Sequence, residues 1–319
     1  EFAEVDNIGT VRNDSSYLQK HIDSVLNLAL VNVEAIKAAE FSVVIDAVNS
    51  TGGIFIPALL EALGVQKITK LYCEPNGQFP HNPEPLPEHL TDLSSKIIET
   101  KADVGFTVDP DVDRLAMVCE DGSMFGEEYT LVAVADYVLN HTPGSTVSNL
   151  SSTRALRDVT EGKGEVYHAS AVGEVNVVSL MKQTKAVIGG EGNGGIIYPE
   201  SHYGRDALVG IALFLSHLAL KKCKTSQLRD SFPKYCISKN KIQLTPDINV
   251  DDVLTQMADK YSGEEVDTTD GVKIYIEKEW VHLRKSNTEP IIRIYSESES
   301  MAAANALANR IKGDINTFI

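Results

Sequence analysis

Residues 41–53 read FSVVIDAVNSTGG. The first seven residues form a run rich in apolar and β-branched side chains, which is typical of a strand buried on both faces of a parallel sheet. Apolar residues recur at helical spacing before this run, between residues 17 and 39, and after it, between residues 54 and 63. The stretch therefore predicts a helix, a buried strand and a second helix in succession, which is the repeating unit of an α/β domain.

The alternation of strands and helices continues on the C-terminal side, first to a turn at residues 141–144 and then to residue 235. Strands that alternate with helices predict βαβ units and a parallel sheet. We therefore predict two three-layer α/β/α domains, at residues 1–144 (with a short linker at the start) and 145–235, and the repeated pattern is compatible with distant duplication. The predicted strands lie at 68–73, 103–108, 146–148 and 186–189, and the predicted helices at 88–100, 127–140, 153–160, 174–182 and 204–221, the last one long and amphipathic.

The pattern changes after residue 226. Short predicted strands surround a helix at 250–261 and precede another at 300–312, which is typical of an α+β domain with a mostly antiparallel sheet. We therefore predict a smaller third domain at residues 236–319. Its strands are expected at 236–244, 272–277, 280–284 and 291–296.

Bulk composition limits the class of protein. The chain has 319 residues, and single hydrophobic cores stop growing at roughly 250–300 residues, so several domains are expected. No apolar run reaches the roughly 18 residues of a membrane span, no signal peptide is visible, and the four cysteines form no CxxC pair, so we expect a cytoplasmic protein. The net charge of -16 argues against nucleic acid or an anionic membrane as a partner, because such partners require clustered Lys and Arg. An anionic ligand would have to bind in a local basic pocket.

The sharpest chemical feature is the sequence DPDVDR at residues 109–114, directly after a predicted strand. Asp109, Asp111 and Asp113 alternate in a turn, so their carboxylates can converge on one hard cation such as Mg²⁺, which prefers oxygen ligands. Arg114 places a positive charge beside them. The alternative is a solvated turn in which the Asp side chains accept hydrogen bonds from their own backbone. We favour the metal site, because three alternating Asp residues are rarer than a single Asp-Pro turn.

The same acidic residues fit positions 1, 3 and 5 of an EF-hand loop, with Glu120 at position 12. Position 6 is Arg114, however, where the loop needs glycine for its sharp turn. The flanking segments are predicted strands, whereas an EF-hand has helices on both sides. These two mismatches argue against an EF-hand.

A glycine-rich motif, GGEGNGG, occupies residues 189–195 after another predicted strand. Glycine allows the backbone to approach a ligand closely, and Glu191 and Asn193 can form hydrogen bonds with hydroxyl groups. This composition suits a sugar better than a phosphate, because neither the lysine of a P-loop nor a GxGxxG pattern at a helix start is present. From this loop alone, a glycine-rich turn with an exposed Glu explains the sequence equally well.

A third motif, RKSNTEP at residues 284–290, lies between two predicted strands and is followed by Arg293. Its guanidinium, amine, hydroxyl and amide groups can supply charge-assisted hydrogen bonds to a phosphate. In a chain of net charge -16, such a cluster is a natural place for an anion to bind. The alternative is a charged hairpin whose basic side chains pair with Glu277 or Glu289.

The three motifs, in this order and in separate predicted domains, resemble the α-D-phosphohexomutase superfamily, which includes phosphoglucomutases, phosphomannomutases and phosphoglucosamine mutases. DPDVDR looks like the family's Mg²⁺ loop, GGEGNGG like its sugar-recognition loop, and RKSNTEP with the following Arg293 like its phosphate-binding loop. Residues 44–53 are also similar to the start of the family's second domain. The resemblance therefore covers nearly the whole chain and implies domains two, three and four of this family.

The resemblance implies a reaction in which a phosphoserine donates its phosphoryl group to a hexose phosphate and later regains the other phosphate from the hexose bisphosphate. Mg²⁺ would neutralise the group in transfer, and Arg114 would help to bind the phosphoserine. The residues implied by match are Asp109, Asp111 and Asp113 for Mg²⁺, Glu191 and Asn193 for sugar hydroxyls, Arg284, Ser286, Asn287 and Thr288 for the phosphate that stays in place, Arg293 in support, and Glu174 as a weaker candidate near the sugar.

The family's first domain carries a TASHNP-like loop with the phosphorylated serine, and the 319 residues contain no such segment. We therefore expect this chain alone to lack mutase turnover and to need the N-terminal domain of the same polypeptide as a partner. Many relatives have Ser or His after the Glu of the sugar loop, where this chain has Asn193 and Gly195. The choice among glucosamine, mannose and glucose phosphates therefore stays open.

Two other functions remain as alternatives. A Mg²⁺-dependent phosphatase could use Asp109 as a nucleophile at the end of a strand, but it would require a lysine and a second acidic cluster in the same domain, which the sequence does not suggest. A non-catalytic protein that binds sugar phosphates would need no serine domain.

Overall fold

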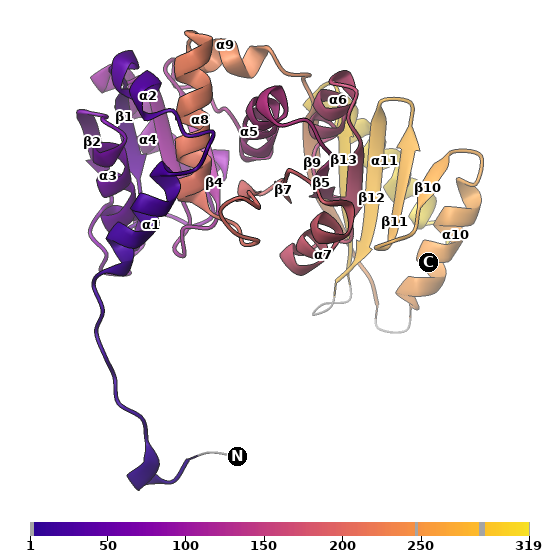
Figure 1. The fold of residues 1–319 in the computed structure, drawn as a ribbon. Coiled ribbons are helices and arrows are strands. Elements are labelled where there is room, and N and C mark those ends of the chain that lie inside the picture. The colour runs from indigo at the N-terminus through magenta and orange to yellow at the C-terminus, as the bar shows by residue number, and fades with distance from the viewer. Residues whose placement is uncertain (1–2, 246–247, 287–290, 319) are drawn as a thin grey trace.

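The computed structural model describes residues 3–245, 248–286 and 291–318. These residues form three β-sheets, of four, four and five strands, which follow one another along the chain (Figure 1). The N-terminal segment, which includes the short 3₁₀ helix η1 (Val5–Asn7), extends away from the first sheet (Figure 1). No helix in the described ranges is long and apolar enough to cross a membrane.

The first sheet has the strand order β2-β1-β3-β4. β1 is parallel to β2 and β3, and β4 is antiparallel to β3. The sequence predicted the parallel strands and the helices between them, although not the antiparallel edge. The elements are β1 (Ser42–Asp46), β2 (Lys67–Leu71), β3 (Val104–Val108), β4 (Leu115–Cys119), α1 (Tyr17–Leu26), α2 (Val33–Ala39), α3 (Gly52–Ala62), η2 (Pro87–His89) and α4 (Thr91–Thr100).

The helical pattern between residues 17 and 39 forms two helices, α1 and α2, with a break between them. Asn27 ends the first helix, and its side-chain amide donates to the carbonyl of Asp23 at 2.7 Å. Asn32 caps the second helix, because its side-chain oxygen accepts a hydrogen bond from the backbone N–H of Ala35 at 2.9 Å. Asparagine is among the preferred N-cap residues, so this capping bond favours a new helix start over a continuous helix.

The second sheet repeats the first, with the order β6-β5-β7-β8. β5 is parallel to β6 and β7, and β8 is antiparallel to β7, as β4 is to β3. The repetition agrees with the duplication suggested by the sequence. The elements are β5 (Thr146–Asn149), β6 (Tyr167–Ser170), β7 (Ile188–Glu191), β8 (Gly195–Ile197), α5 (Glu127–His141), α6 (Ala155–Gly162), α7 (Glu174–Thr184), α8 (Ala207–Lys221) and α9 (Thr225–Asp230).

Helix α8 is buried on all sides, which corrects the prediction of an amphipathic helix. Every residue from Ala207 to Ala219 is buried. The helix packs against α2 and α5, and α5 in turn packs against β7 of the second sheet. One buried apolar cluster therefore runs through both α/β sheets, so the two repeats share a core.

The third sheet is antiparallel throughout, with the order β10-β11-β12-β13-β9, as the sequence predicted for an α+β domain. It has its own apolar cluster between one sheet face and helices α10 and α11. The opposite face turns toward the second sheet, where Ser151 contacts His282 at 3.0 Å. The elements are β9 (Cys236–Gln243), α10 (Val250–Lys260), β10 (Glu265–Asp267), β11 (Val272–Ile276), β12 (Glu279–Lys285), β13 (Ile291–Ser298) and α11 (Met301–Ile315).

Candidate functional site

The acidic motif forms the turn between β3 and β4. Asp109 follows the last residue of β3, and its Oδ1 accepts hydrogen bonds from the backbone N–H groups of Asp113 at 3.1 Å and Arg114 at 3.0 Å. These bonds fold the turn back on its first residue. Val112 adopts a left-handed backbone with φ of 62°, which is rare for a β-branched residue and costs on the order of 1–3 kcal/mol. The turn is therefore held in a strained shape, as is common at functional sites.

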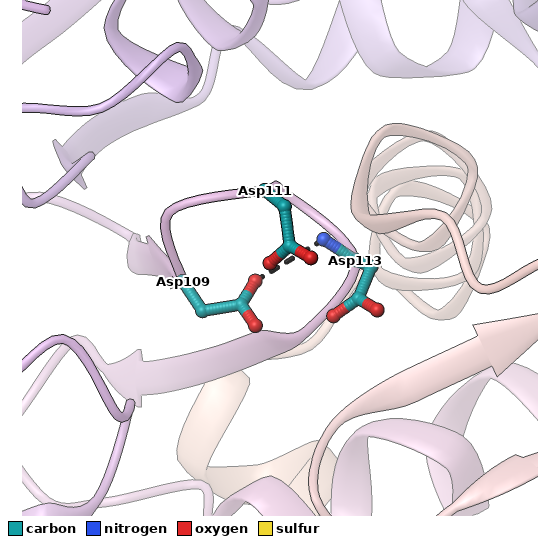
Figure 2. Close-up of side chains that lie close together, drawn as sticks. All are labelled: Asp109, Asp111 and Asp113. Atoms are coloured by element: carbon teal, nitrogen blue, oxygen red, sulfur yellow. Dashed lines mark hydrogen bonds between the residues drawn. The ribbon is translucent and has the colours of Figure 1, made fainter. Parts of the chain in front are cut away.

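The three carboxylates of this turn surround a common space (Figure 2). Asp109, Asp111 and Asp113 each offer an oxygen within 4.8 Å of the others. Oδ1 of Asp113 is buried and has no hydrogen-bond partner among the described residues. Burial, together with the charges of Asp113 and Asp111, raises the pKa of Asp109 to about 7 despite the hydrogen bond from Arg114. Three converging carboxylates are oxygen ligands of the kind that a hard cation prefers, so the donor set fits Mg²⁺.

Arg114 lies at the edge of the acidic turn. Its Nε is 3.3 Å from Oδ2 of Asp109 and 3.8 Å from Oδ1 of Asp113. About a third of its side chain is exposed, at 31%. The guanidinium therefore leaves part of its surface available to an anionic ligand beside the carboxylates.

The glycine-rich motif forms the turn between β7 and β8, which is the same position in the second sheet. Leu115 N donates to Gly194 O at 3.0 Å, and Arg114 forms an isolated β-bridge with Gly195. A side chain at Gly194 would collide with the carbonyl of Leu115, and its φ of 90° also disfavours other residues. The glycines therefore let the backbones of the two turns pair directly.

Glu191, at the end of β7, is 5% exposed and has partners on both carboxylate oxygens. Its Oε1 accepts from Asn149 Nδ2 at 2.8 Å and from Gly173 N at 3.2 Å. Its Oε2 accepts from Arg205 Nη1 at 2.9 Å. Asn193 stays within its own turn, where its Oδ1 accepts from Gly195 N at 3.2 Å. Glu191 is thus held in one orientation.

One pocket joins the glycine-rich turn to the third sheet. It has a volume of about 170 Å³ and brings Glu191 and Asn193 together with Arg284 and Arg293. The strand register explains the last two, because Arg284 on β12 pairs with Arg293 on β13 and paired residues project to the same face. The other lining residues are Glu128, Asn149, Ser151, Val172, Gly192, Lys239 and Tyr295.

Arg284 is anchored on its inner side. Its Nε is 2.9 Å from Oδ2 of Asp270, and the same carboxylate oxygen accepts from the backbone N–H of Val172 at 2.9 Å. The carboxylate therefore links the second and third sheets at the pocket. Ser286 is buried, and its backbone N–H donates to Ile291 O at 3.1 Å. Asn287 and Thr288 lie outside the described residues.

Comparisons with known proteins agree with this arrangement. Family models for phosphoglucomutase/phosphomannomutase match the chain in order: α/β/α domain II at residues 19–122, α/β/α domain III at 126–235 and the C-terminal domain at 240–313. The chain belongs to the α-D-phosphohexomutase superfamily. The resemblance inferred from the three motifs is confirmed.

Relatives in the superfamily match along most of the chain. A phosphoglucomutase/phosphomannomutase of Thermococcus kodakarensis is 35% identical over 301 residues, which are 93% of this chain and 65% of that protein. A Methanopyrus kandleri protein named "Probable phosphoglucosamine mutase" is 30% identical over 96% of this chain and 67% of its own length. The crystal structure of a phosphoglucomutase/phosphomannomutase family protein from Burkholderia thailandensis superposes with a TM-score of 0.81 at 27% identity, covering 94% of this chain and 64% of that one. The chain thus spans about two thirds of the length of these relatives.

Sequence reasoning missed several residues at this site, above all Arg205, Lys239 and Asn149. Asn149 ends β5, and the carboxyl end of a parallel strand is a position that could have singled it out. Arg205 and Lys239 carry no local signal, because they are single basic residues outside the three motifs, and only the folded chain brings Arg205 to Asp113 and Lys239 into the pocket lining. Glu174 lies against Arg205, whose backbone N–H donates to its Oε1 at 3.1 Å, and it is not among the residues that line the pocket.

Proposed function

We propose that this chain supplies the metal-binding, sugar-binding and phosphate-binding parts of a phosphohexomutase. The full reaction would interconvert hexose 6-phosphate and hexose 1-phosphate through a phosphoserine and a hexose bisphosphate. The observation that carries this proposal is the pocket that brings Glu191 and Asn193 of the glycine-rich turn together with Arg284 and Arg293 from another domain, because the same turn pairs with the end of the acidic turn. Such a pocket can hold a sugar and a phosphate together.

The acidic turn would bind Mg²⁺ through Asp109, Asp111 and Asp113. When bound, the ion supplies positive charge beside a phosphoryl group in transfer. Arg114, at the edge of this turn, would hold the phosphate of the phosphoserine by charge-assisted hydrogen bonds. This end of the site would thus receive the group that moves.

The pocket would bind the rest of the substrate. Arg284 and Arg293 would hold the phosphate that stays in place, and Lys239 adds a third cation to the lining. Ser286, Asn287 and Thr288 are the further phosphate-binding residues of this proposal. Glu191 and Asn193 would form hydrogen bonds with sugar hydroxyls. Glucosamine, mannose and glucose phosphates all carry hydroxyls that could serve here.

We further propose that the nucleophilic serine belongs to another domain of the same polypeptide, so that this chain alone does not turn over hexose phosphates. The site would bind both the hexose phosphate and the bisphosphate. The four cysteines are free thiols, which agrees with a reducing compartment such as the cytoplasm.

Calorimetric titration with the 6-phosphates of glucosamine, mannose and glucose, in Mg²⁺, tests the proposal. We expect millimolar or tighter binding that is lost in Arg284→Gln, because that change removes the guanidinium that faces the ligand phosphate. Arg310→Gln is the matched control, since Arg310 lies on helix α11 on the other side of the third sheet. If none of the three ligands binds, the proposal is contradicted. Equal loss of affinity in Arg284→Gln and Arg310→Gln would also contradict it.

Two enzymatic measurements separate the alternatives. Release of inorganic phosphate from hexose 6-phosphate by this chain would favour the phosphatase over the mutase. Turnover of hexose 1-phosphate to 6-phosphate by this chain alone would contradict the need for a serine domain. Binding without turnover, even after a serine domain from a relative is added, would favour a non-catalytic sugar-phosphate binding protein.

A further inference from the structure

Arg205 lies between the acidic turn and the glycine-rich turn, and its guanidinium contacts carboxylates from three separate segments. Nη2 donates to Oδ2 of Asp113, Nη1 donates to Oε2 of Glu191 at 2.9 Å, and Nε lies 3.3 Å from Oε2 of Glu174. The side chain is only 13% exposed. A guanidinium so enclosed is committed to these partners and has little surface left for a ligand.

The contact with Glu191 completes the orientation of that carboxylate. Asn149 and Gly173 donate to Oε1, whereas Arg205 donates to Oε2. Without Arg205, one oxygen would lose its partner and the carboxylate could rotate about its last torsion, which is broad for Glu.

The contact with Asp113 similarly gives the two oxygens of that carboxylate different surroundings. Oδ2 accepts from Arg205, while Oδ1 is buried and has no hydrogen-bond partner among the described residues. Arg205 thus holds one oxygen of this member of the acidic cluster and leaves the other without a hydrogen bond.

Arg205 is itself rigidly placed. Its backbone N–H donates to Oε1 of Glu174 at 3.1 Å, and its side chain packs over Gly195, where any Cβ would collide with its Cδ. The next residue, Asp206, caps helix α8 by accepting from Leu208 N at 2.8 Å. The guanidinium therefore projects from the fixed start of a buried helix.

We propose that Arg205 is a positioning residue that holds Glu191 and Asp113 in one fixed arrangement, so that the sugar bound in the pocket is presented to the acidic turn at a constant distance. This role rests on the proposed binding of hexose phosphate. Lysine cannot replace Arg205, because an ammonium is a point charge and lacks the planar fork that reaches several carboxylates at once.

The first test compares two ligands on this chain. In Arg205→Lys and Arg205→Met, affinity for glucose 6-phosphate is expected to fall about tenfold to a hundredfold, because a misoriented Glu191 loses a charge-assisted hydrogen bond to the sugar, and such a bond contributes about that factor. Affinity for inorganic phosphate is expected to change by less than about twofold, since the contacts of Arg284 and Arg293 are untouched. Arg157→Met, which removes a surface arginine paired with Glu161, is the matched control for the loss of a guanidinium. Equal loss for both ligands in Arg205→Lys would overturn the proposal.

The second test asks whether Arg205 acts through Glu191. If it does, Arg205→Met should weaken glucose 6-phosphate binding little further once Glu191→Gln is present, because residues that act as a unit are not additive. A double variant whose affinity loss equals the product of the two single losses would show independent action and would refute the positioning role.

The third test needs no ligand. A double-mutant cycle of Asp113→Asn and Glu191→Gln, followed by urea unfolding, should show coupling in the chain with Arg205 and none in the Arg205→Met background. Absence of coupling with Arg205 present overturns the inference. Failure of the chain to bind any hexose phosphate, with this coupling intact, would instead count against the proposed function.

Discussion

The β3–β4 turn and the β7–β8 turn occupy the same position in two sheets of the same strand order, but their chemistry is opposite. The first places three carboxylates around a space that suits a cation. The second carries Glu191 and Asn193 on a glycine frame that faces a pocket lined by arginines. The same hairpin thus carries a carboxylate cluster or a glycine frame with one glutamate, depending on the length and composition of its turn.

The ends of the central strands extend the comparison. β1 ends at Asp46, whose Oδ1 accepts from Val48 N at 3.0 Å, and β5 ends at Asn149, whose Oδ1 accepts from Ser151 N at 2.9 Å. Both side chains therefore accept the same hydrogen bond from the turn that follows their strand. They differ in the second side-chain atom, which is an oxygen in Asp46 and an amide nitrogen in Asn149. Asp46 offers its second oxygen to His81, whereas Asn149 offers an N–H to Glu191. A carboxylate at position 149 would repel Glu191, so the amide suits this position.

The largest effect is expected from breaking the contact between the two turns. Gly194→Ala should lower the free energy of unfolding by about 3 kcal/mol, because it combines a left-handed backbone with a collision against the Leu115 carbonyl. Gly164→Ala is the matched control, since it has a similar φ of 80° and open space around its Cβ, and should cost about 1–2 kcal/mol. Urea unfolding measures both, and equal losses would mean that the two turns do not depend on close backbone pairing.

A smaller effect should follow from removing one carboxylate of the first turn. Asp111 is exposed, so Asp111→Asn should leave stability nearly unchanged while weakening Mn²⁺ binding about tenfold or more through loss of a charged ligand. Electron paramagnetic resonance of free Mn²⁺ gives the affinity. Asp230 is an exposed acid paired with Lys234 elsewhere on the chain, so Asp230→Asn is the control. It should bind Mn²⁺ as the unchanged protein does. Unaltered Mn²⁺ affinity in Asp111→Asn would mean that Asp111 is not a ligand, and the β3–β4 turn would then not differ from the β7–β8 turn as a cation site.

The basic wall of the pocket offers a matched pair of substitutions on strand β9. Lys239 lines the pocket, whereas Lys241, on the same strand and face two residues away, is not among the lining residues. Lys239→Gln should weaken hexose phosphate binding by about 1 kcal/mol, since its ammonium is partly exposed and screened, and Lys241→Gln should change it little. Calorimetry in low salt compares them. Equal weakening would indicate a general electrostatic effect instead of a contact in the pocket.

The smallest effect concerns pH and the first sheet alone. A hydrogen bond from His81 to Asp46, at 2.9 Å, raises the pKa of His81 above its usual 6.5. A histidine whose pKa is raised by folding stabilises the protein fully below the unfolded pKa, and this contribution disappears as pH rises through the folded pKa. His81→Gln should therefore cost stability, by less than about 1 kcal/mol, near pH 6 and progressively less at higher pH. Unfolding curves that show a constant or growing cost toward pH 8 would contradict this pairing.

Much of the fold could be predicted from local patterns. The run at residues 41–47 and the helical spacing around it predicted β1 and its flanking helices, although the break at Asn27 and Asn32 depends on individual capping bonds. A strand was expected after the acidic loop, but not its antiparallel place at the sheet edge as β4, and β8 was missed altogether, because a short strand that returns after a turn has little periodicity of its own. Helix α8 was taken as amphipathic because its full burial depends on packing between two repeats.

The sequence by itself determined the chemistry of each turn, because the three Asp residues, the glycines and the basic residues each fall within one short stretch of the chain. Only the tertiary structure decided how these turns meet. The pairing of Gly194 with Leu115, the joint pocket of Glu191 and Arg284, and the three contacts of Arg205 all join residues far apart in sequence. Such contacts arise from how whole sheets and helices pack, which short-range residue patterns do not encode.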